Sequence, residues 1–307
     1  MLASEFRELM KVGVGRVARR LDQDLPLTAA DLQNWIKSLT GTDEPADYFL
    51  HPVAFPLMLL PWWLERQLKG KCNPKFQSDL IFSNASLYYY IRLVDNVMDN
   101  HATVEPKLLP VAGYFVDQFQ SIYCGYFEAG HPFWDFFRRT WSEFCDITAA
   151  DGMLTEIDLQ TFTHLVGRKV CAAKISVAAV CYWHERPELL PLWDEWIDLF
   201  GCWHLFREDM FDWQQDLDLG TVTYFLSEAK RRKEAGEPEV SWLARAGLDW
   251  GFEQLNGWML RLRQMTFASS EVQSYLDFRE KELFERRGTL GPALDFIRQM
   301  TGSGTRE

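Results

Sequence analysis

The chain has 307 residues, of which 47% are apolar and 25% are charged, a composition that is ordinary for a globular protein with a large core. Its net charge of −12 and a pI near 5.1 argue against a nucleic-acid partner, which would need a basic face, and against docking on anionic lipid. Aromatic residues make up 15% of the chain. That surplus suits either a densely packed core or the wall of a pocket for an apolar ligand.

Several features bear on where the protein resides. The N-terminal stretch 1–20 lacks the apolar core of a signal peptide. The longest apolar run, Val53–Leu64, is too short to span a bilayer and contains Pro56 and Pro61. The six cysteines show no CxxC pair and no zinc-ligand spacing, which favours buried free thiols in a reducing compartment. We therefore expect a cytoplasmic protein without stable membrane insertion.

Apolar residues recur with a helical period along the chain, and no alternating strand pattern is present. The pattern predicts one all-α domain over 1–307, with an N-terminal helix over 1–25 and a disordered tail over 302–307. The stretch Thr28–Asp31 predicts a helix start with a capping side chain. Further helices are predicted at 52–69, 76–100, 104–126, 131–148, 156–184, 188–218, 240–267, 270–283 and 286–300. Gly, Pro and Asn residues predict breaks at Gly41–Pro45, Asn73–Pro74, Gly130–Pro132, Arg186–Pro187 and Gly236–Pro238.

The first unusual feature lies in the predicted helix 76–100, which is otherwise apolar and aromatic. Asp95 and Asp99 are four residues apart, so on a helix they share one face. Two carboxylates stacked in this way repel each other and cost stability unless a cation neutralises them. The alternative is a polar helix end, because Asn100 and His101 begin a loop.

A second acidic stretch follows about 110 residues later. Its carboxylates recur at i, i+4, i+8 or at i, i+3, i+7, and either set draws a stripe that drifts only about 40° per four-residue step. The two sets are Glu208, Asp212, Asp216 and Asp209, Asp212, Asp216. Like charges in a partly buried stripe call for cations, and magnesium fits because it takes oxygen ligands and shares them with phosphates. The alternative is a solvated acidic face.

The two acidic stretches resemble the motifs of a known family. The run Ile91–Asp99 resembles the first Asp-rich motif of class I isoprenoid synthases, in the Leu-Arg-x-x-Asp-x-x-x-Asp form of squalene and phytoene synthases, and it is similar to the first motif of bacterial large-terpene synthases. The run Asp212–Tyr224 looks like their second motif, with Gly220 and Tyr224 in the same places. The resemblance covers residues 76–226.

This resemblance implies a helical bundle with a central apolar cavity, in which two acidic helices hold three Mg²⁺ ions and the diphosphate of a prenyl substrate. Mn²⁺ is an expected substitute. The implied metal ligands are Asp95, Asp99, Glu208, Asp209, Asp212 and Asp216. The main hypothesis is a terpene synthase that ionises one prenyl diphosphate, cyclises or rearranges the carbocation and releases diphosphate. The alternative is a prenyltransferase or condensing enzyme of the squalene/phytoene or polyprenyl synthase type. A non-catalytic lipid-binding or interaction scaffold is a third, more distant hypothesis, and a homodimer is left open.

The sequence departs from the family pattern at two positions. Asn96 stands where chain-elongating prenyltransferases have the second Asp of DDxxD, which argues against head-to-tail elongation. The second motif has an Asp where terpene cyclases usually have Ser or Thr. The subfamily therefore stays open.

In families of this type, a helix between the motifs supplies cationic contacts to the diphosphate and a helix break directed at the substrate. Arg168, Lys169 and Lys174 are the candidates here. Lys169 and Lys174 would point about 140° apart on an unbroken helix, so not all three are expected to serve. Arg207, beside the acidic stripe, either contacts phosphate or pairs with an Asp. By resemblance, Tyr224 is a further diphosphate contact.

The substrate tail is expected to run along the helix face that carries Asp95. Helical spacing back from Asp95 gives Ile91, Arg92 and then Tyr88, seven residues away and about 10 Å along the axis. Tyr88 would form part of the cavity wall, or it would only pack the bundle. His204 lies one turn before Glu208 and is either a cavity residue or a core histidine.

Overall fold

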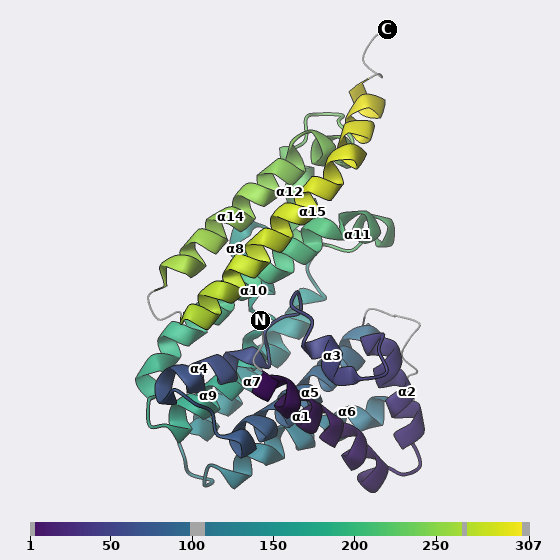
Figure 1. Cartoon of the computed structure of the whole chain (residues 1–307). Coiled ribbons are helices and arrows are strands. Elements are labelled where there is room, and N and C mark those ends of the chain that lie inside the picture. Colours follow the sequence, from purple (N-terminus) through teal and green to yellow (C-terminus); the bar gives the residue numbers. More distant parts are fainter. Residues whose placement is uncertain (1–3, 99–107, 266–268, 303–307) are drawn as a thin grey trace. The chain divides into compact units, whose positions relative to one another are not determined.

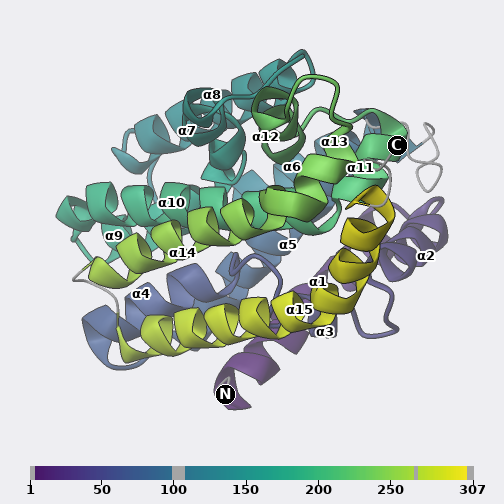
Figure 2. The same ribbon diagram turned by 90° about the horizontal axis from the view of Figure 1, so that it is seen from above.

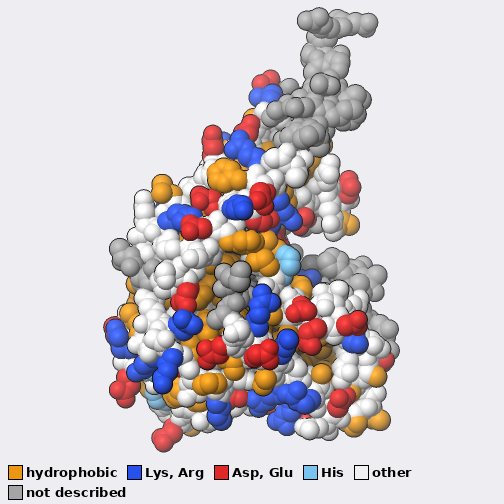
Figure 3. All heavy atoms as spheres, viewed as in Figure 1, with side chains coloured by type: hydrophobic (Ala, Val, Ile, Leu, Met, Phe, Trp, Pro, Cys, Tyr) orange, Lys and Arg blue, Asp and Glu red, His pale blue; other side chains and the backbone are white. Residues whose placement is uncertain are grey.

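The computed structural model in Figure 1 describes residues 4–98, 108–265 and 269–302, and the side chains up to residue 289. All regular elements in these ranges are helices, and they contain no strand, so the all-α prediction is confirmed. Among the described residues, no helix is both long and apolar enough to cross a bilayer. On the face shown in Figure 3, acidic and basic side chains are interspersed with apolar ones.

Chain contacts divide the molecule into two compact units. Unit 1 comprises Met1–Phe136 and Ile175–Glu188, and unit 2 comprises Phe137–Lys174 and Leu189–Glu307. The prediction of a single domain over 1–307, with a central apolar cavity, stays a prediction. Each unit is described by itself.

Unit 1 is built around a long helix, α5 (Pro74–Met98), which packs against α1 (Ser4–Asp24) and α6 (Leu109–Ser121). The middle of α5 is buried on every side, as expected of a helix that is enclosed by its neighbours. One of its buried polar groups, Ser83 Oγ, donates to the Phe119 carbonyl at 2.8 Å. The remaining elements are α2 (Ala29–Thr40), α3 (Pro45–Phe49), α4 (Leu59–Lys69), η2 (Ile122–Gly125), the first turn of α7 (Phe133–Asp151) and most of α9 (Lys174–Trp183).

Unit 2 is organised by α10 (Leu190–Phe211), which packs against α14 (Leu248–Gln264) and α12 (Tyr224–Arg232). An aromatic cluster fills the space around Phe206, whose ring centroid lies 5.4 Å from that of Tyr224. The other elements are the rest of α7, α8 (Leu159–His164), η3 (Val166–Arg168), η4 (Cys171–Ala173), the last residue of η5 (Pro187–Leu189), α11 (Trp213–Leu219), α13 (Glu239–Trp242), the π-turn η6 (Leu243–Gly247) and α15 (Ser270–Gly302).

The predicted breaks are confirmed. Gly41 ends α2 in the left-handed region at φ 64°, and Asn73 Oδ1 accepts a hydrogen bond from the Phe76 amide at the start of α5. Thr28 does precede the first residue of α2, but its side chain makes no capping hydrogen bond, so the predicted cap is wrong. Of the cysteines, four are buried free thiols as predicted, whereas Cys124 and Cys145 are exposed.

Five predicted helices differ from the structure. The segment 156–184 is not one helix but α8, two short 3₁₀ turns and α9. The segment 188–218 is interrupted at Asp212. The predicted helix 52–69 begins at Leu59, after two prolines at 52 and 56. The predicted helices 270–283 and 286–300 are joined in α15, which reaches Gly302. Residues 303–307 of the predicted tail lie outside the described residues.

Candidate metal and diphosphate site

The second acidic stretch bends where α10 meets α11. Asp212, at φ −99° and ψ 8°, ends α10 and precedes α11. The Asp212 amide donates to the Glu208 carbonyl at 2.9 Å, and the Asp216 amide donates to the Asp212 carbonyl at 3.0 Å. These bonds keep the chain close to helical geometry through the junction. The acids therefore stay one turn apart along a bent stripe.

Asp209 has the most perturbed carboxylate of this stripe. Burial raises its pKa to about 8, and the charge of Asp216 adds to this; the Tyr224 backbone amide, which hydrogen-bonds Asp209, and Lys169 act in the opposite direction. The residue as a whole is half-buried, but its Oδ2 is buried and has no hydrogen-bond partner among the described residues. Burial and the charge of Asp212 raise the pKa of Asp216 to about 6. The ionised stripe is therefore under-neutralised by the protein.

This electrostatic state fits a cation with oxygen ligands, because a buried carboxylate oxygen without a donor is costly. Within the described part of the chain, however, no three His, Cys, Asp or Glu side chains are already arranged around a common metal position. The donor set fits Mg²⁺ in its chemistry, and the side chains would have to turn toward the ion on binding.

Glu208 and Arg207 belong to an ion-pair network that includes Glu282 on α15. Arg207 is 2% exposed and donates from Nη1 to Glu208 at 3.0 Å and from Nη2 to Glu282 at 2.7 Å. Its partners are glutamates, so the predicted pairing with an Asp is wrong. Burial raises the pKa of Glu208, and the charges of Arg207 and other arginines oppose this.

His204 also belongs to this part of the core. Its ring stacks on Phe200 with centroids 6.1 Å apart, and Nδ1 lies 3.4 Å from Nη2 of Arg279 on α15. Burial holds the pKa of His204 well below its usual range, so the ring is neutral and can accept from Arg279. These contacts favour the core histidine over the cavity residue.

The three basic candidates are placed at two levels along α10. Lys174, which is 4% exposed, pairs with Asp198 at 2.7 Å, and Arg168 pairs with Glu143 and with Asp198. Asp198 precedes Asp209 by eleven residues, or about 16 Å of helix. Lys169 pairs instead with Asp151 at 2.7 Å and lies close enough to Asp209 to lower its pKa. The structure thus associates Lys169 with the acidic stripe, and associates Arg168 and Lys174 with the Asp198 level.

A close backbone approach explains the broken segment that carries these residues. A Cβ atom on Gly167 would lie 2.3 Å from the sulfur of Cys202, and one on Gly201 would lie 2.3 Å from the Gly167 carbonyl oxygen. Only glycine fits at such distances. The chain between α8 and α9 therefore lies directly on α10. The predicted separation of Lys169 and Lys174 by about 140° does not apply, because it assumed an unbroken helix.

Tyr224 contributes its backbone rather than its hydroxyl to the stripe. Its amide bonds Asp209, whereas its ring stacks on Phe162 with centroids 4.9 Å apart. Burial raises the pKa of the Tyr224 hydroxyl to about 12. A diphosphate contact through this hydroxyl remains a prediction.

The first acidic motif lies in unit 1, at the end of α5. Asp95 pairs with Arg92 at 2.8 Å, and Asp99 lies outside the described residues. Asn96 is 3% exposed, and its Oδ1 has no hydrogen-bond partner among the described residues. Ile91 is half-buried. That the two acidic helices face each other across a cavity stays a prediction.

Tyr88 is packed against α3. Its hydroxyl donates to the Tyr48 hydroxyl at 2.6 Å, and its ring lies 5.0 Å from that of Phe49. Burial raises the pKa of Tyr88. The residue therefore has the packing contacts of the alternative hypothesis, and a role as a cavity wall remains a prediction.

The sequence hypothesis missed the carboxylates that pair with the basic candidates. These carboxylates lie 18 to 75 residues away along the chain from the basic side chains with which they pair. The pairs are Asp151 with Lys169, Asp198 with Lys174 and Glu282 with Arg207. No local spacing connects these residues to their partners. Asp198 lies one helical turn after Asp194 in the predicted helix 188–218, so it is the one that the sequence could have indicated.

Comparisons with known proteins now complement this geometry. No family model matches the chain, and no curated protein sequence does either. The all-helical architecture is nevertheless that of the isoprenoid synthases. The similarity is to a solved structure, geranylgeranyl pyrophosphate synthetase from the archaeon Geoglobus acetivorans, with a TM-score of 0.64 over 97% of this chain and 99% of that chain. The identity is 12%, so the similarity establishes the fold.

Proposed function

We propose that the protein is a Mg²⁺-dependent prenyltransferase, which ionises an allylic prenyl diphosphate and joins its prenyl group to a second isoprenoid. One observation carries the proposal. The under-neutralised carboxylates at the α10–α11 junction, with Asp209 Oδ2 lacking a donor among the described residues, occur in the fold of a geranylgeranyl pyrophosphate synthetase. This fold supports prenyl transfer better than it supports cyclisation.

Each residue has a separate role in this proposal. Asp209, Asp212 and Asp216, with Glu208 at the edge, would hold Mg²⁺ in unit 2, and Asp95 and Asp99 would hold it in unit 1. When bound, Mg²⁺ supplies positive charge to the leaving diphosphate. Lys169, whose charge lowers the pKa of Asp209, would contact the diphosphate by exchanging its pair with Asp151. Arg168 and Lys174 are already neutralised by carboxylates and would act on the diphosphate only if those pairs opened.

A terpene synthase is the second candidate, and Asn96 is the observation that favours it. Elongating enzymes have an Asp at this position of the motif, whereas Asn96 is neutral and buried. A buried carboxylate there would need a partner or a metal. With Asn, the first motif has fewer charged ligands, which is closer to the pattern of enzymes that act on one prenyl diphosphate.

The experiment that decides between these candidates supplies one or two substrates. Each of the ten-, fifteen-, twenty- and twenty-five-carbon diphosphates is incubated with Mg²⁺, or with Mn²⁺, with and without isopentenyl diphosphate. Released diphosphate and extracted products are measured. Longer products that require isopentenyl diphosphate indicate elongation, and products with twice the carbon number indicate condensation. Hydrocarbons or alcohols from one substrate alone indicate a terpene synthase.

Absence of diphosphate release under every condition would contradict both enzymes and would favour a lipid-binding or interaction scaffold. Chelator provides the control, because release that continues in excess chelator would contradict a metal-dependent reaction.

A further inference from the structure

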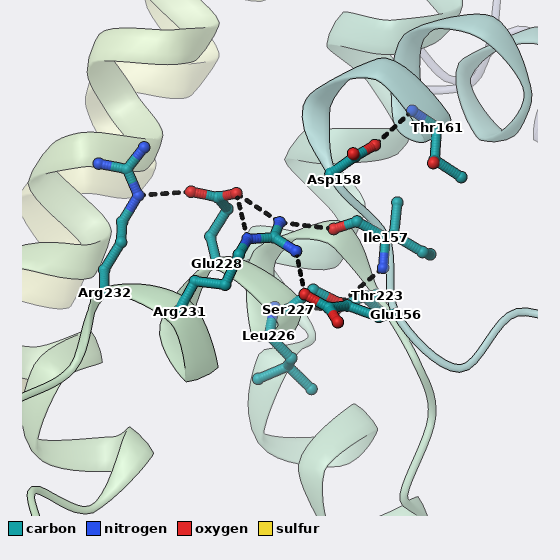
Figure 4. Close-up of polar contacts among 10 residues, drawn as sticks. All are labelled: Glu156, Ile157, Asp158, Thr161, Thr223, Leu226, Ser227, Glu228, Arg231 and Arg232. Atoms are coloured by element: carbon teal, nitrogen blue, oxygen red, sulfur yellow. Dashed lines mark hydrogen bonds and ion pairs between the residues drawn. The ribbon is translucent and has the colours of Figure 1, made fainter. Parts of the chain in front are cut away.

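Both backbone groups of Ile157 are bonded to helix α12. Ile157 lies in the loop 152–158 between α7 and α8 and is 2% exposed. Its amide donates to Ser227 Oγ at 3.1 Å, and its carbonyl accepts from Nη2 of Arg231 at 2.7 Å (Figure 4). Its neighbours in the loop are mostly exposed, and Met153 is 76% exposed. Ile157 is therefore the anchor of this loop.

Two adjacent arginines on α12 differ in what they reach. Arg231 and Arg232 both pair with the buried Glu228. Arg231 continues across to Glu156 and the Ile157 carbonyl, as Figure 4 shows. Arg232 instead lies over the ring of Trp250, 4.7 Å from its centroid. Of the two, Arg231 is the one that joins α12 to the loop, and its planar guanidinium, with several donors, suits such a junction.

The two elements joined by Arg231 carry different parts of the acidic site. The loop directly follows Asp151, which pairs with Lys169 at 2.7 Å. Helix α12 begins at Tyr224, whose amide bonds Asp209. A shift of the loop against α12 would therefore move Lys169 relative to Asp209. The contacts of Arg231 oppose that shift, although Arg231 lies two turns of α12 beyond Tyr224.

We propose that Arg231 is a positioning residue for the binding of a metal–diphosphate ligand: by clamping the loop 152–158 to α12, it holds Lys169 and the Tyr224 amide beside Asp209. The inference rests on the proposed function of the acidic stripe. Arg231 is not proposed to contact the ligand, so its effect on binding must arise from the position of the loop.

The test measures binding by calorimetry, with Mg²⁺ titrated in the presence of inorganic diphosphate. Arg231→Met removes the clamp, and Arg232→Met is the matched control on the next residue, where Glu228 keeps Arg231 as its partner. We expect Arg231→Met to weaken Mg²⁺–diphosphate binding roughly tenfold, the scale for outer partners of a metal site, and Arg232→Met to change it less than about twofold. Arg231→Lys, which keeps the charge but not the planar geometry, should recover part of the loss.

Two outcomes would overturn the inference. One is unchanged binding by a folded Arg231→Met protein; the other is equal weakening in both variants in proportion to their loss of melting temperature. If Arg231→Met does not fold, Ser227→Ala removes the acceptor of the Ile157 amide and should weaken binding in the same direction. Absence of binding by the wild-type protein would contradict the proposed function itself, so the two failures are distinguishable.

Discussion

The two acidic regions share a residue spacing but differ in their electrostatics. On α5 in unit 1, Asp95 has a partner one turn back, Arg92, at 2.8 Å. At the α10–α11 junction in unit 2, the charges that act on Asp209 and Asp216 include other carboxylates, and burial raises their pKa values to about 8 and about 6. The first region keeps its described acid neutralised within one helix. The second stores repulsion that a bound cation would relieve.

A similar contrast exists inside unit 2. Lys174 and Arg168 neutralise Asp198 on the same helix that carries the acidic stripe. The Asp198 level of α10 thus has a closed ion-pair cluster, and the C-terminal end of the helix has excess negative charge. A carboxylate on an apolar helix therefore indicates a ligand site only where the fold provides no cation to neutralise it.

The largest effect on stability is expected at the closed cluster. Lys174→Met should lower the free energy of unfolding by about 3 kcal/mol, because it leaves the half-buried carboxylates of Asp198 and Asp194 without their main cation. Burial already raises the pKa of the neighbouring Asp194 to about 6. Denaturant unfolding measures the change, with Lys169→Met as the partly exposed control, for which a loss below about 1 kcal/mol is expected. Equal losses in both variants would contradict the contrast.

The acidic stripe at the C-terminal end of α10 should lose stability when a negative charge forms, rather than when a cation is removed. The pKa of Asp209 is raised to about 8 in the folded protein, so the folded state keeps this proton more tightly than the unfolded chain does. Stability without metal should therefore fall as pH rises from about 4 to about 8, by an amount on the order of a few kcal/mol. Asp209→Asn should flatten this slope, measured by unfolding at a series of pH values. The exposed Asp218→Asn on α11 should retain it; a retained slope in Asp209→Asn would assign it elsewhere.

Activity measurements compare the two acidic motifs directly. Asp212→Asn and Asp95→Asn should each lower turnover at least about a hundredfold, the scale for losing a major electrostatic element, if both regions hold the metals. The assay is diphosphate release at saturating Mg²⁺, with Asp218→Asn as the control. Near wild-type turnover in Asp95→Asn alone would confine the metal site to unit 2.

The smallest effect is expected at Arg92. Its pair with Asp95 is about one-third exposed on both sides, so Arg92→Met should change the free energy of unfolding by no more than about 1 kcal/mol. Chemical denaturation of the metal-free protein measures it, with Arg92→Lys retaining the charge. A loss of several kcal/mol would show that unit 1 also depends on a buried charge balance.

The parts that could be predicted from the sequence are those set by neighbours along the chain. Helical periodicity and turn residues place α5, α10 and the break at Asn73–Pro74, because these depend on residues within a few positions. The four-residue spacing likewise identifies the stripe at 208–216. Periodicity could not place the interruption after α8, which only the family resemblance implied, because it depends on the approach of Gly167 to α10. The same holds for the pairing of Arg207 with Glu282, which are 75 residues apart.

The contact between Gly167 and Gly201 has a consequence for how the chain can vary. Any side chain at either position would collide with its neighbour at 2.3 Å, and the broken segment would have to lift from α10. Lys169 would move with it, although Gly201 lies two turns of α10, about 12 Å, before Asp209. In a complete substitution survey, changes at either glycine should therefore be tolerated as poorly as changes at the acidic residues. Natural homologues should then keep glycine at both positions as strictly as they keep the acidic residues.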